Sequence, residues 1–585
     1  MTIPSEDEIL NKITAILDRY SDLNDLNAFL STKTGIRDFF QSKRSLEEFR
    51  KFLTESHSIK YGSKELGDFQ TPNHLTDKIC NLLADKGVRP DIILEPTCGQ
   101  GNFIVSALKS FPSVRYIYCV DIQRKYEHPF KLNILKYSLE RDINARIEFH
   151  FDNIFTHRFS EEFVQYLEAP NSEILILGNP PWATSSKLSV LNSTNLPIKS
   201  NIKRLPRGIE ALTGKSNFDI AEFIILQMLK QFSRKRGKLA MLCKTSVIRN
   251  IVRDMLKLSL TISNLEALLI DARKEFNINT EGALFLADLG SGQQAICTVS
   301  SLYNPKQKIK KFGWVDDKFV SDIELYQKYG LLDGQSPFEW RQGVKHDASK
   351  VMVLSVNTSG ILTNGFGEVI DVEEDRIYPF IKGSELRKPV IMNASKKIII
   401  TQTSLLENTD YIAMKYPKLW RYLTSHSAYL DNRKSKIYQG RPRFSLFGIG
   451  EYSFKPYKVA ISGLYKSPNF SLLLPIDGKP AMLDDTCYYL SFNDLNVAIF
   501  TWTLLNSQIV KDFLNSIAFL DAMRSYTKEV LMRVNIVKVA EQTSFNEVLN
   551  FYERYLAHYL EEKIKEKDYR DFQDFLKLTT SRRFH

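Results

Sequence analysis

One segment of the chain combines an amide, two prolines and an aromatic ring directly after a predicted strand. Residues 174–177 are apolar, which predicts a strand buried in a sheet, and the sequence continues through Gly178 to Asn179, Pro180, Pro181 and Trp182. The side-chain oxygen of Asn179 and the carbonyl oxygen of Pro180 could accept hydrogen bonds from one planar amine, while Trp182 stacks on the attached ring. The segment therefore predicts chemistry at an exocyclic amino group, although prolines after a strand also occur simply as turns.

Three other predicted strands end in an acidic side chain. Glu95, Asp121 and Asp152 each follow a strand-like run. Because open α/β sheets bind ligands at the carboxyl ends of their strands, we expect these carboxylates and Asn179 at one edge of a sheet. A carboxylate such as Asp121 can accept both hydroxyls of a ribose, and Glu95 can pair with an ammonium group. For Asp121 alone, the N-cap of a helix is an equally good interpretation.

A glycine loop follows the first of these strands and leads into a predicted helix. Gly99 and Gly101 allow a backbone to approach a ligand where a β-carbon would collide with it. The loop lacks the third glycine of the dinucleotide-binding fingerprint, so taken alone it is weak evidence. Further upstream, Thr71 and Pro72 begin another predicted helix.

Together these motifs resemble those of S-adenosylmethionine-dependent amino-methyltransferases, chiefly the N6-adenine DNA methyltransferases of bacterial restriction-modification systems. The cofactor motifs precede the Asn-Pro-Pro-Trp segment and a long variable region follows it, which is similar to the order in the gamma group of these enzymes. The resemblance implies S-adenosyl-L-methionine as the cofactor. It implies that the cofactor is bound by Thr71, Glu95, Thr97, Cys98, Gly99, Gly101, Asp121, Ile122, Asp152, Asn153 and Asn179.

The resemblance also implies how the reaction proceeds. The implied catalytic residues are Asn179, Pro180, Pro181 and Trp182, and the target base would stack on Trp182 and on Phe276 in a later loop. An adenine inside a duplex must be flipped out to reach such a pocket. Methyl transfer then depends on alignment and desolvation, and no covalent intermediate is needed. Tyrosine or phenylalanine is commoner in the family at the position of Trp182, which leaves the size of the pocket open.

Other functions are compatible with parts of the sequence. N4-cytosine methylation would use the same amide-accepting chemistry. Glutamine methylation of proteins uses a similar Asn-Pro-Pro motif but leaves residues 336–585 unexplained. A non-catalytic DNA-binding specificity subunit agrees with the charge of the chain but not with its intact pocket motifs. Methylation of a cytosine ring carbon needs a nucleophilic cysteine after a proline, and the sequence contains no Pro-Cys pair.

The elements that position these residues predict an α/β protein of more than one domain. We expect residues 67–335 to form a class I methyltransferase domain, a Rossmann-like fold with a seven-stranded mixed sheet. Residues 1–66 are expected to form a helical N-terminal segment. Residues 336–585 are expected to form a separate α+β domain that recognises the DNA target and ends in helices.

The charge of the chain indicates its partner. Lys and Arg exceed Asp and Glu to give a formal net charge of +11, which favours binding to phosphate backbones, although a solvated basic surface is the alternative. We expect double-stranded DNA as the partner. A restriction endonuclease would be a separate protein, because the N-terminal segment is too short for a nuclease domain. The expected DNA-binding residues are Lys199, Lys203, Arg204, Arg433, Lys436, Arg441 and Arg443.

Cysteine usage and the N-terminus indicate the compartment. The six cysteines are scattered and form no Cys-x-x-Cys pair, so we expect neither a disulfide framework nor a metal site. The N-terminal residues are acidic and lack the apolar core of a signal peptide, and no apolar run is long enough to cross a bilayer. We therefore expect a cytoplasmic protein with no membrane partner, and the resemblance implies that it is a DNA-associated protein of a bacterium or archaeon.

Overall fold

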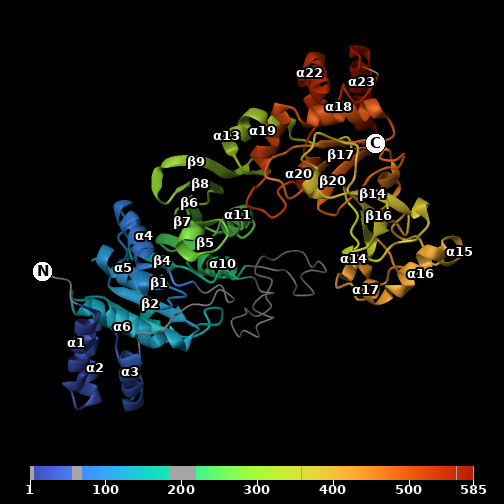
Figure 1. Cartoon of the computed structure of the whole chain (residues 1–585). Helices are drawn as coiled ribbons and strands as arrows, with labels where there is room; N and C mark the ends of the chain where they lie inside the picture. The colour runs from blue at the N-terminus through green and yellow to red at the C-terminus, as the bar shows by residue number, and fades with distance from the viewer. Residues whose placement is uncertain (1–4, 56–68, 184–218, 358, 562, 584–585) are drawn as a thin grey trace. The chain divides into compact units, whose positions relative to one another are not determined.

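The computed structural model describes residues 5–55, 69–183, 219–357, 359–561 and 563–583. The chain divides into two compact units, Met1–Phe319 and Val320–His585 (Figure 1). The sequence predicted a domain boundary between residues 335 and 336. In the structure the second unit begins at Val320, and it therefore includes residues 320–335. None of the helices in these described ranges is long and apolar enough to cross a lipid bilayer.

The first unit is built around one mixed sheet of ten strands. The order of the strands across the sheet is β10-β9-β8-β6-β7-β5-β4-β1-β2-β3. The strands are β1 (Ile92–Glu95), β2 (Tyr116–Asp121), β3 (Arg146–Phe151), β4 (Ile174–Gly178), β5 (Gly237–Lys244), β6 (Ile262–Ile270), β7 (Gly282–Leu289), β8 (Ile296–Ser301), β9 (Asn304–Val315) and β10 (Lys318–Val320).

The direction of the strands identifies the fold. Strands β1 to β5 pair in parallel, and β7 lies antiparallel between β5 and β6. This arrangement of the first seven strands is the class I methyltransferase sheet, which confirms the expected fold class. Strand β8 pairs in parallel with β6, and β9 returns antiparallel to it, so the sheet continues beyond the seven expected strands.

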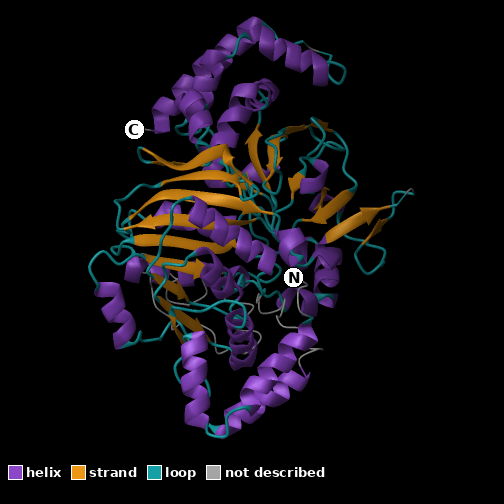
Figure 2. Cartoon of the chain, turned by 90° about the vertical axis from the view of Figure 1, so that its left-hand side faces the viewer, coloured by secondary structure: helices purple, strands orange, loops and turns teal. Residues whose placement is uncertain are grey.

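Helices cover the sheet on both faces, as Figure 2 shows. They are α4 (Asn73–Asp85), α5 (Asn102–Ser110), α6 (Glu127–Ser138), α7 (Glu161–Glu168), α10 (Ile220–Phe232), α11 (Thr245–Asp254) and α12 (Ala272–Phe276). The residues of β1, β2 and β4 are consequently all buried, which explains why these strands are apolar runs instead of alternating patterns.

The N-terminal helices pack against the β3 edge of this sheet. They are α1 (Glu6–Asp18), α2 (Leu23–Thr34) and α3 (Lys43–Glu55). After α2, the backbone N–H of Ile147 in β3 donates a hydrogen bond of 2.9 Å to the carbonyl of Gly35. The Phe49 ring of α3 lies 5.6 Å from the ring of His128 in α6. The described part of this segment therefore packs as part of the first unit.

The second unit contains two five-stranded sheets, with strand orders β11-β20-β17-β18-β15 and β13-β12-β16-β14-β19. Its strands are β11 (Arg341–Gln342), β12 (Val353–Val356), β13 (Leu362–Thr363), β14 (Ile377–Ile381), β15 (Val390–Ile391), β16 (Lys396–Ile399), β17 (Tyr457–Ser462), β18 (Ser471–Leu473), β19 (Met482–Leu483) and β20 (Cys487–Phe492). Its helices are α13 (Ile323–Tyr329), α14 (Ser349–Met352), α15 (Ile412–Lys415), α16 (Pro417–Ser425), α17 (Ser427–Asp431), α18 (Leu495–Leu505), α19 (Gln508–Ile517), α20 (Lys528–Met532), α21 (Ile536–Gln542), α22 (Phe545–Tyr555) and α23 (Glu566–Arg583).

Candidate active site

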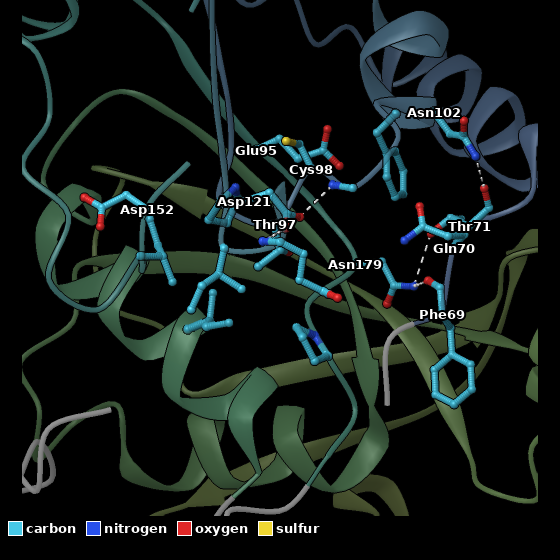
Figure 3. A pocket seen from close by; sticks show the side chains of 18 residues that line it. Phe69, Gln70, Thr71, Glu95, Thr97, Cys98, Asn102, Asp121, Asp152 and Asn179 are labelled. Carbon is cyan, nitrogen blue, oxygen red and sulfur yellow. Dashed lines mark hydrogen bonds between the residues drawn. The ribbon is translucent and has the colours of Figure 1, made fainter. Parts of the chain in front are cut away.

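A pocket lies where β1, β2, β3 and β4 end (Figure 3). Its empty space amounts to about 670 Å³, which includes open solvent. Its lining includes most of the residues expected to bind the cofactor, namely Thr71, Glu95, Thr97, Cys98, Gly99, Asp121, Ile122, Asp152 and Asn179, together with Pro181. Gly101, Asn153, Pro180 and Trp182 are not among the residues that line it.

The loop between β1 and α5 is held in a backbone conformation that favours glycine. Gly99 and Gly101 have φ angles of +51° and +76°. A β-carbon on Gly101 would lie 2.7 Å from the Phe130 ring. The backbone N–H of Gly99 donates a 2.8 Å hydrogen bond to Asp121, which joins the ends of β1 and β2. Gly101 therefore does not line the pocket, but it allows the loop that lines it to pack against Phe130.

Glu95 places a carboxyl group in the interior of the pocket. Its residue is only 2% exposed, and its Oε2 atom has no hydrogen-bond partner within the described ranges. Burial, followed by the neighbouring Cys119 and Asp121, raises the pKa of Glu95 well above its ordinary value. Thr97 Oγ1 is likewise buried without a partner. A ligand that brought an ammonium and further donors here would satisfy both groups, so the pocket fits the polar end of S-adenosylmethionine.

Asp121 is positioned by the backbone at the end of β2. Its Oδ2 atom accepts from Gly99, and its Oδ1 atom accepts a 2.8 Å hydrogen bond from the backbone N–H of Gln123. These two bonds fix the plane of the carboxylate.

Asp152 lies on the opposite side of the pocket from Asn102 and Thr71 (Figure 3). Its Oδ2 atom is 2.8 Å from Nδ1 of His157, whose Nε2 atom is 2.7 Å from the hydroxyl of Tyr118. The hydrogen bond from His157 is the largest cause that lowers the pKa of Asp152. The side chain of Asn153 instead accepts from the backbone N–H of Phe155, so Asn153 shapes the turn after β3.

The amide of Asn179 has a defined orientation. Its Nδ2 atom donates hydrogen bonds of 3.1 Å to the carbonyl of Phe69 and of 3.1 Å to the hydroxyl of Thr71. Its Oδ1 atom is buried and has no partner among the residues described. With both donor contacts on one side, the free acceptor is available to an amine, as the Asn-Pro-Pro-Trp segment predicts.

Trp182 and Phe276 lie together beside this site, in a cluster with Phe69. The Trp182 ring is 5.5 Å from Phe276 and 6.5 Å from Phe69, both in edge-to-face arrangements. Trp182 is 6% exposed, and its tip packs against Gly282, where a β-carbon would come within 2.5 Å of it. Phe276 was expected in a loop, but it is the last residue of the short helix α12 and is buried.

Several pocket residues were not predicted from the sequence, and they are Phe69, Gln70, Asn102, Phe103, Gln123 and Ile224. Asn102 donates a 2.8 Å hydrogen bond to the carbonyl of Thr71 and so joins α5 to the segment before α4. Most of these residues adjoin motif positions, and that adjacency was the available signal. Ile224 comes from α10 and carried no local signal at all.

The expected DNA-binding residues have different environments. Lys199, Lys203 and Arg204 lie outside the described residues. Lys436 and Arg443 are exposed, and Arg441 is half-buried. Arg443 forms a 3.1 Å ion pair with Asp431.

Arg433 differs from the other basic residues of its segment. Its guanidinium donates to the carbonyls of Leu430, His346 and Ser445 at 2.7, 3.3 and 2.7 Å. It also stacks 3.7 Å from the Tyr438 ring, and burial lowers its pKa. Arg433 was expected to bind DNA, but its donors are directed at the protein backbone, so we predict a structural role for it instead.

Two chemical features of the described residues bear on other cofactors. No group of three or more His, Cys, Asp or Glu side chains in these ranges could hold a metal ion. All six cysteines are buried and unbridged.

Comparisons with known proteins place this pocket in a family. The family model described as N-6 DNA Methylase matches residues 52–255. The type II methyltransferase M.NspV of Nostoc sp. is 39% identical over 489 residues, which is 83% of this chain and 99% of that protein. Two solved structures align at low identity. They are the type IIL restriction-modification enzyme MmeI in complex with DNA (13% identity, TM-score 0.48, 98% of this chain and 75% of that chain) and the type IIG restriction endonuclease BpuSI (12%, 0.32, 92% and 68%).

The family match decides between the functions that the sequence left open. It covers the glycine loop, the acidic strand ends and the Asn-Pro-Pro-Trp segment, and it specifies N-6 methylation of DNA instead of N4-cytosine, protein or purely DNA-binding function. The chain belongs to the N-6 DNA methylase family and is an S-adenosylmethionine-dependent, adenine-specific DNA methyltransferase of the restriction-modification type.

Proposed function

We propose that Asn179 and Pro180 hold the N6 amine of a flipped adenine in double-stranded DNA, and that the pocket beside them holds the methyl donor. The observation that supports this most directly is the buried Oδ1 atom of Asn179, which has no partner within the described ranges while the amide is anchored through Nδ2 to Phe69 and Thr71. A buried acceptor of this kind costs about 1–3 kcal/mol when it is unsatisfied, and an amine donor recovers that cost.

The residues of the chain then perform distinct tasks. S-adenosylmethionine, when bound, supplies a methyl group on a sulfonium. Glu95 receives its ammonium, Asp121 its ribose hydroxyls and Asp152 the amine of its adenine. Asn179 and the Pro180 carbonyl accept the two N–H groups of the target amine, so its lone pair is directed toward the methyl group. Catalysis then comes from alignment and from charge stabilisation in a site without bulk water.

The target base needs a second binding surface. Flipping an adenine out of the duplex costs a few kcal/mol, which stacking can return. Trp182, three residues after Asn179 in the chain, and Phe276 supply two aromatic rings whose centroids are 5.5 Å apart. We assign the stacking role to this pair. Because the Trp182 ring packs edge-to-face against Phe69 and the Phe276 ring lies 6.0 Å from Phe69, the rings would have to separate when the base enters.

The remaining assignments concern DNA and partners. Exposed Lys436 and Arg443 and half-buried Arg441 are assigned to phosphate or base contacts, as are Lys199, Lys203 and Arg204. The chain would act in the cytoplasm as the modification enzyme, with a restriction endonuclease as a separate protein.

The test is methyl transfer by Asn179→Ala. With labelled S-adenosylmethionine and duplex DNA, the variant should lose at least about 100-fold in kcat, because a positioned polar group of this kind contributes 10²–10³. DNA affinity should stay near that of the parent protein. Nucleoside analysis identifies the product as N6-methyladenine.

The matched control is Asn81→Ala, on the exposed face of α4, where an amide is also removed. It should keep full activity. Turnover by Asn179→Ala close to that of Asn81→Ala would contradict the proposed role of Asn179.

A further inference from the structure

Five cationic side chains form an exposed group at the β8–β9 hairpin and the two helices next to it. We call this group the hairpin patch, and it consists of Lys78, Arg273, Lys274, Lys306 and Lys308. Lys78 belongs to α4, Arg273 and Lys274 to α12, and the last two to β9. All five are exposed, and they come from three segments of the sequence that span 230 positions, from Lys78 to Lys308. No motif in the sequence pointed to them.

Sheet topology places this hairpin at the same edge as the active site. Strand β6 runs in the direction of β4, since both it and β5 are antiparallel to β7. Strand β8 is parallel to β6, so its carboxyl end, Ser301, lies at the edge where β4 delivers Asn179. The chain turns there and enters β9, with Ser301 paired to Asn304 and Ser300 to Lys308 (Figure 1).

Hydrogen bonds connect the hairpin to the aromatic cluster at the target pocket. The hydroxyl of Tyr303, in the turn, donates 2.7 Å to Oε1 of Glu275, and Oε2 of Glu275 is 2.7 Å from Nε2 of His74. The Nζ atom of Lys78 lies 5.3 Å from the Tyr303 ring. The residue after Glu275 is Phe276, which contacts Trp182. The patch is therefore fixed relative to the site.

The charges of the hairpin patch are uncompensated. Within the part of the chain that the structure describes, none of the five forms an ion pair within 4.0 Å. The carboxylate of Glu275 is engaged by Tyr303 and His74, and its side chain is only 2% exposed. Asp271 is exposed, but its Oδ1 atom caps α12. By contrast, Lys86, the residue that follows α4, is paired with Glu266 at 2.8 Å.

We propose that the hairpin patch binds the phosphate backbone of duplex DNA beside the flipped adenine. Lysines and an arginine that form no ion pair with the described residues can each contact a phosphate group of DNA. A surface that only faces solvent gives no reason for these cations to lack acidic partners. The location beside the flipped base rests on the proposed function of Asn179. Such contacts position the DNA and carry no sequence information.

The test is the salt dependence of DNA binding by the double variant Lys306→Ala/Lys308→Ala. Each lost phosphate contact lowers the slope of log K against log salt by about 0.9, so the slope should fall by roughly 1.8. Binding of duplexes with and without the target sequence is measured by fluorescence anisotropy over a range of NaCl concentrations. The variant should also raise KM for DNA, while kcat at saturating DNA stays unchanged.

The matched control is Lys12→Ala/Lys257→Ala, which removes the same net charge from exposed lysines of the first unit. Lys12 is in α1, and Lys257 lies before β6, at the opposite edge of the sheet from the hairpin. Equal slopes for the two double variants would overturn the proposal and leave the patch as a solvated face. Unchanged S-adenosylmethionine affinity reports that both fold.

The two proposals fail in different ways. Slope measurements need no methyl transfer, so they test the hairpin patch even if Asn179→Ala remains active. Conversely, equal slopes leave the nucleoside analysis of the product unaffected. A third variant, Arg273→Ala/Lys274→Ala, should lower the slope by a similar amount, because the same surface includes α12.

Discussion

At the scale of single residues, the pocket is marked by buried atoms that the chain itself does not satisfy. Glu95 Oε2, Thr97 Oγ1 and Asn179 Oδ1 are buried without partners among the described residues. Folding normally pairs such atoms, since each costs about 1–3 kcal/mol when left unpaired. Their concentration in one pocket is explained if a ligand with several donors completes the site.

Asp121 should contribute to cofactor affinity through charge. In Asp121→Asn the side chain keeps its size but loses its charge, and one of its two backbone N–H partners, Gly99 or Gln123, faces an amide donor. We expect S-adenosylmethionine to bind about 10- to 100-fold more weakly, or roughly 1.4–2.8 kcal/mol, by calorimetric titration. Asp91→Asn, at the amino end of β1, is the control. Equal losses in the two variants would exclude a specific role.

At the scale of elements, the β1–α5 loop works because its glycine positions have no β-carbons. Gly101 has a positive φ and lies directly against the ring of Phe130 in α6. The loop therefore depends both on a local backbone conformation and on the packing of a helix that follows it in the chain. A loop whose glycine has a positive φ but no neighbouring side chain would depend only on the backbone conformation.

Gly101→Ala and Gly87→Ala separate these two contributions. Gly87 has a φ of +82° and no atom within 4 Å of a β-carbon, so its alanine variant should lose only about 1 kcal/mol of unfolding free energy. Gly101→Ala should lose about 2–4 kcal/mol and should also bind S-adenosylmethionine more weakly. Urea denaturation and cofactor titration measure the two effects. Identical behaviour of the variants would show that the Phe130 contact is unimportant.

The guanidinium of Arg433 joins three backbone segments through hydrogen bonds to the carbonyls of His346, Leu430 and Ser445. Arg433→Ala should lower the free energy of unfolding by about 2–4 kcal/mol, since three backbone carbonyls lose a charged donor. The salt dependence of DNA binding, measured well below the unfolding temperature, should change little. Exposed Lys436→Ala should leave the free energy of unfolding nearly unchanged and should reduce the salt dependence of DNA binding. A stable Arg433→Ala variant with a reduced salt slope would restore Arg433 as a DNA contact.

At the scale of the whole molecule, each unit has its own core. In the second unit, one core cluster includes Phe380, Ile398 and Leu419, and the strands β17 and β20 pair over six residues. Lys458 of β17 is 1% exposed within this sheet, and its Nζ atom donates 2.8 Å to the carbonyl of Lys455. Burial lowers the pKa of Lys458 to about 7.

Lys458 should make the stability of the protein depend on pH. Between pH 7 and its ordinary pKa of 10.5, the unfolded chain binds a proton that the folded chain does not. Stability contributed by this group therefore rises with pH across that window, and its penalty is complete below pH 7. In Lys458→Met the slope should fall by about 1.4 kcal/mol per pH unit.

The measurement is urea denaturation of the full chain between pH 7 and 9. Lys458→Met should also be more stable at pH 7, by roughly 1–4 kcal/mol, because a buried cation is replaced by an apolar side chain. Exposed Lys434→Met is the control and should leave both quantities unchanged. Parallel pH profiles for the parent protein and Lys458→Met would mean that Lys458 keeps its proton in both the folded and the unfolded state, so that burial does not lower its pKa.

The sequence alone determined the seven-stranded part of the sheet and most of the pocket. The strands that lead to Glu95, Asp121 and Asn179 are buried along their whole length, so each is readable as a local apolar run, whereas the strand before Asp152 is only partly buried. Their carboxyl ends must meet at one edge because parallel strands share a direction. Local patterns were sufficient for the strands and their ends.

Only the tertiary structure decided which side chains complete or leave the site. Phe69 and Thr71 anchor the amide of Asn179 from 108 or more positions away, and Arg433 turns inward to carbonyls of its own unit. The hairpin patch joins α4, α12 and β9, although its residues are far apart in sequence. Such contacts depend on packing between distant segments, and the type of a charged or aromatic residue does not specify whether it faces a carbonyl, a ligand or solvent.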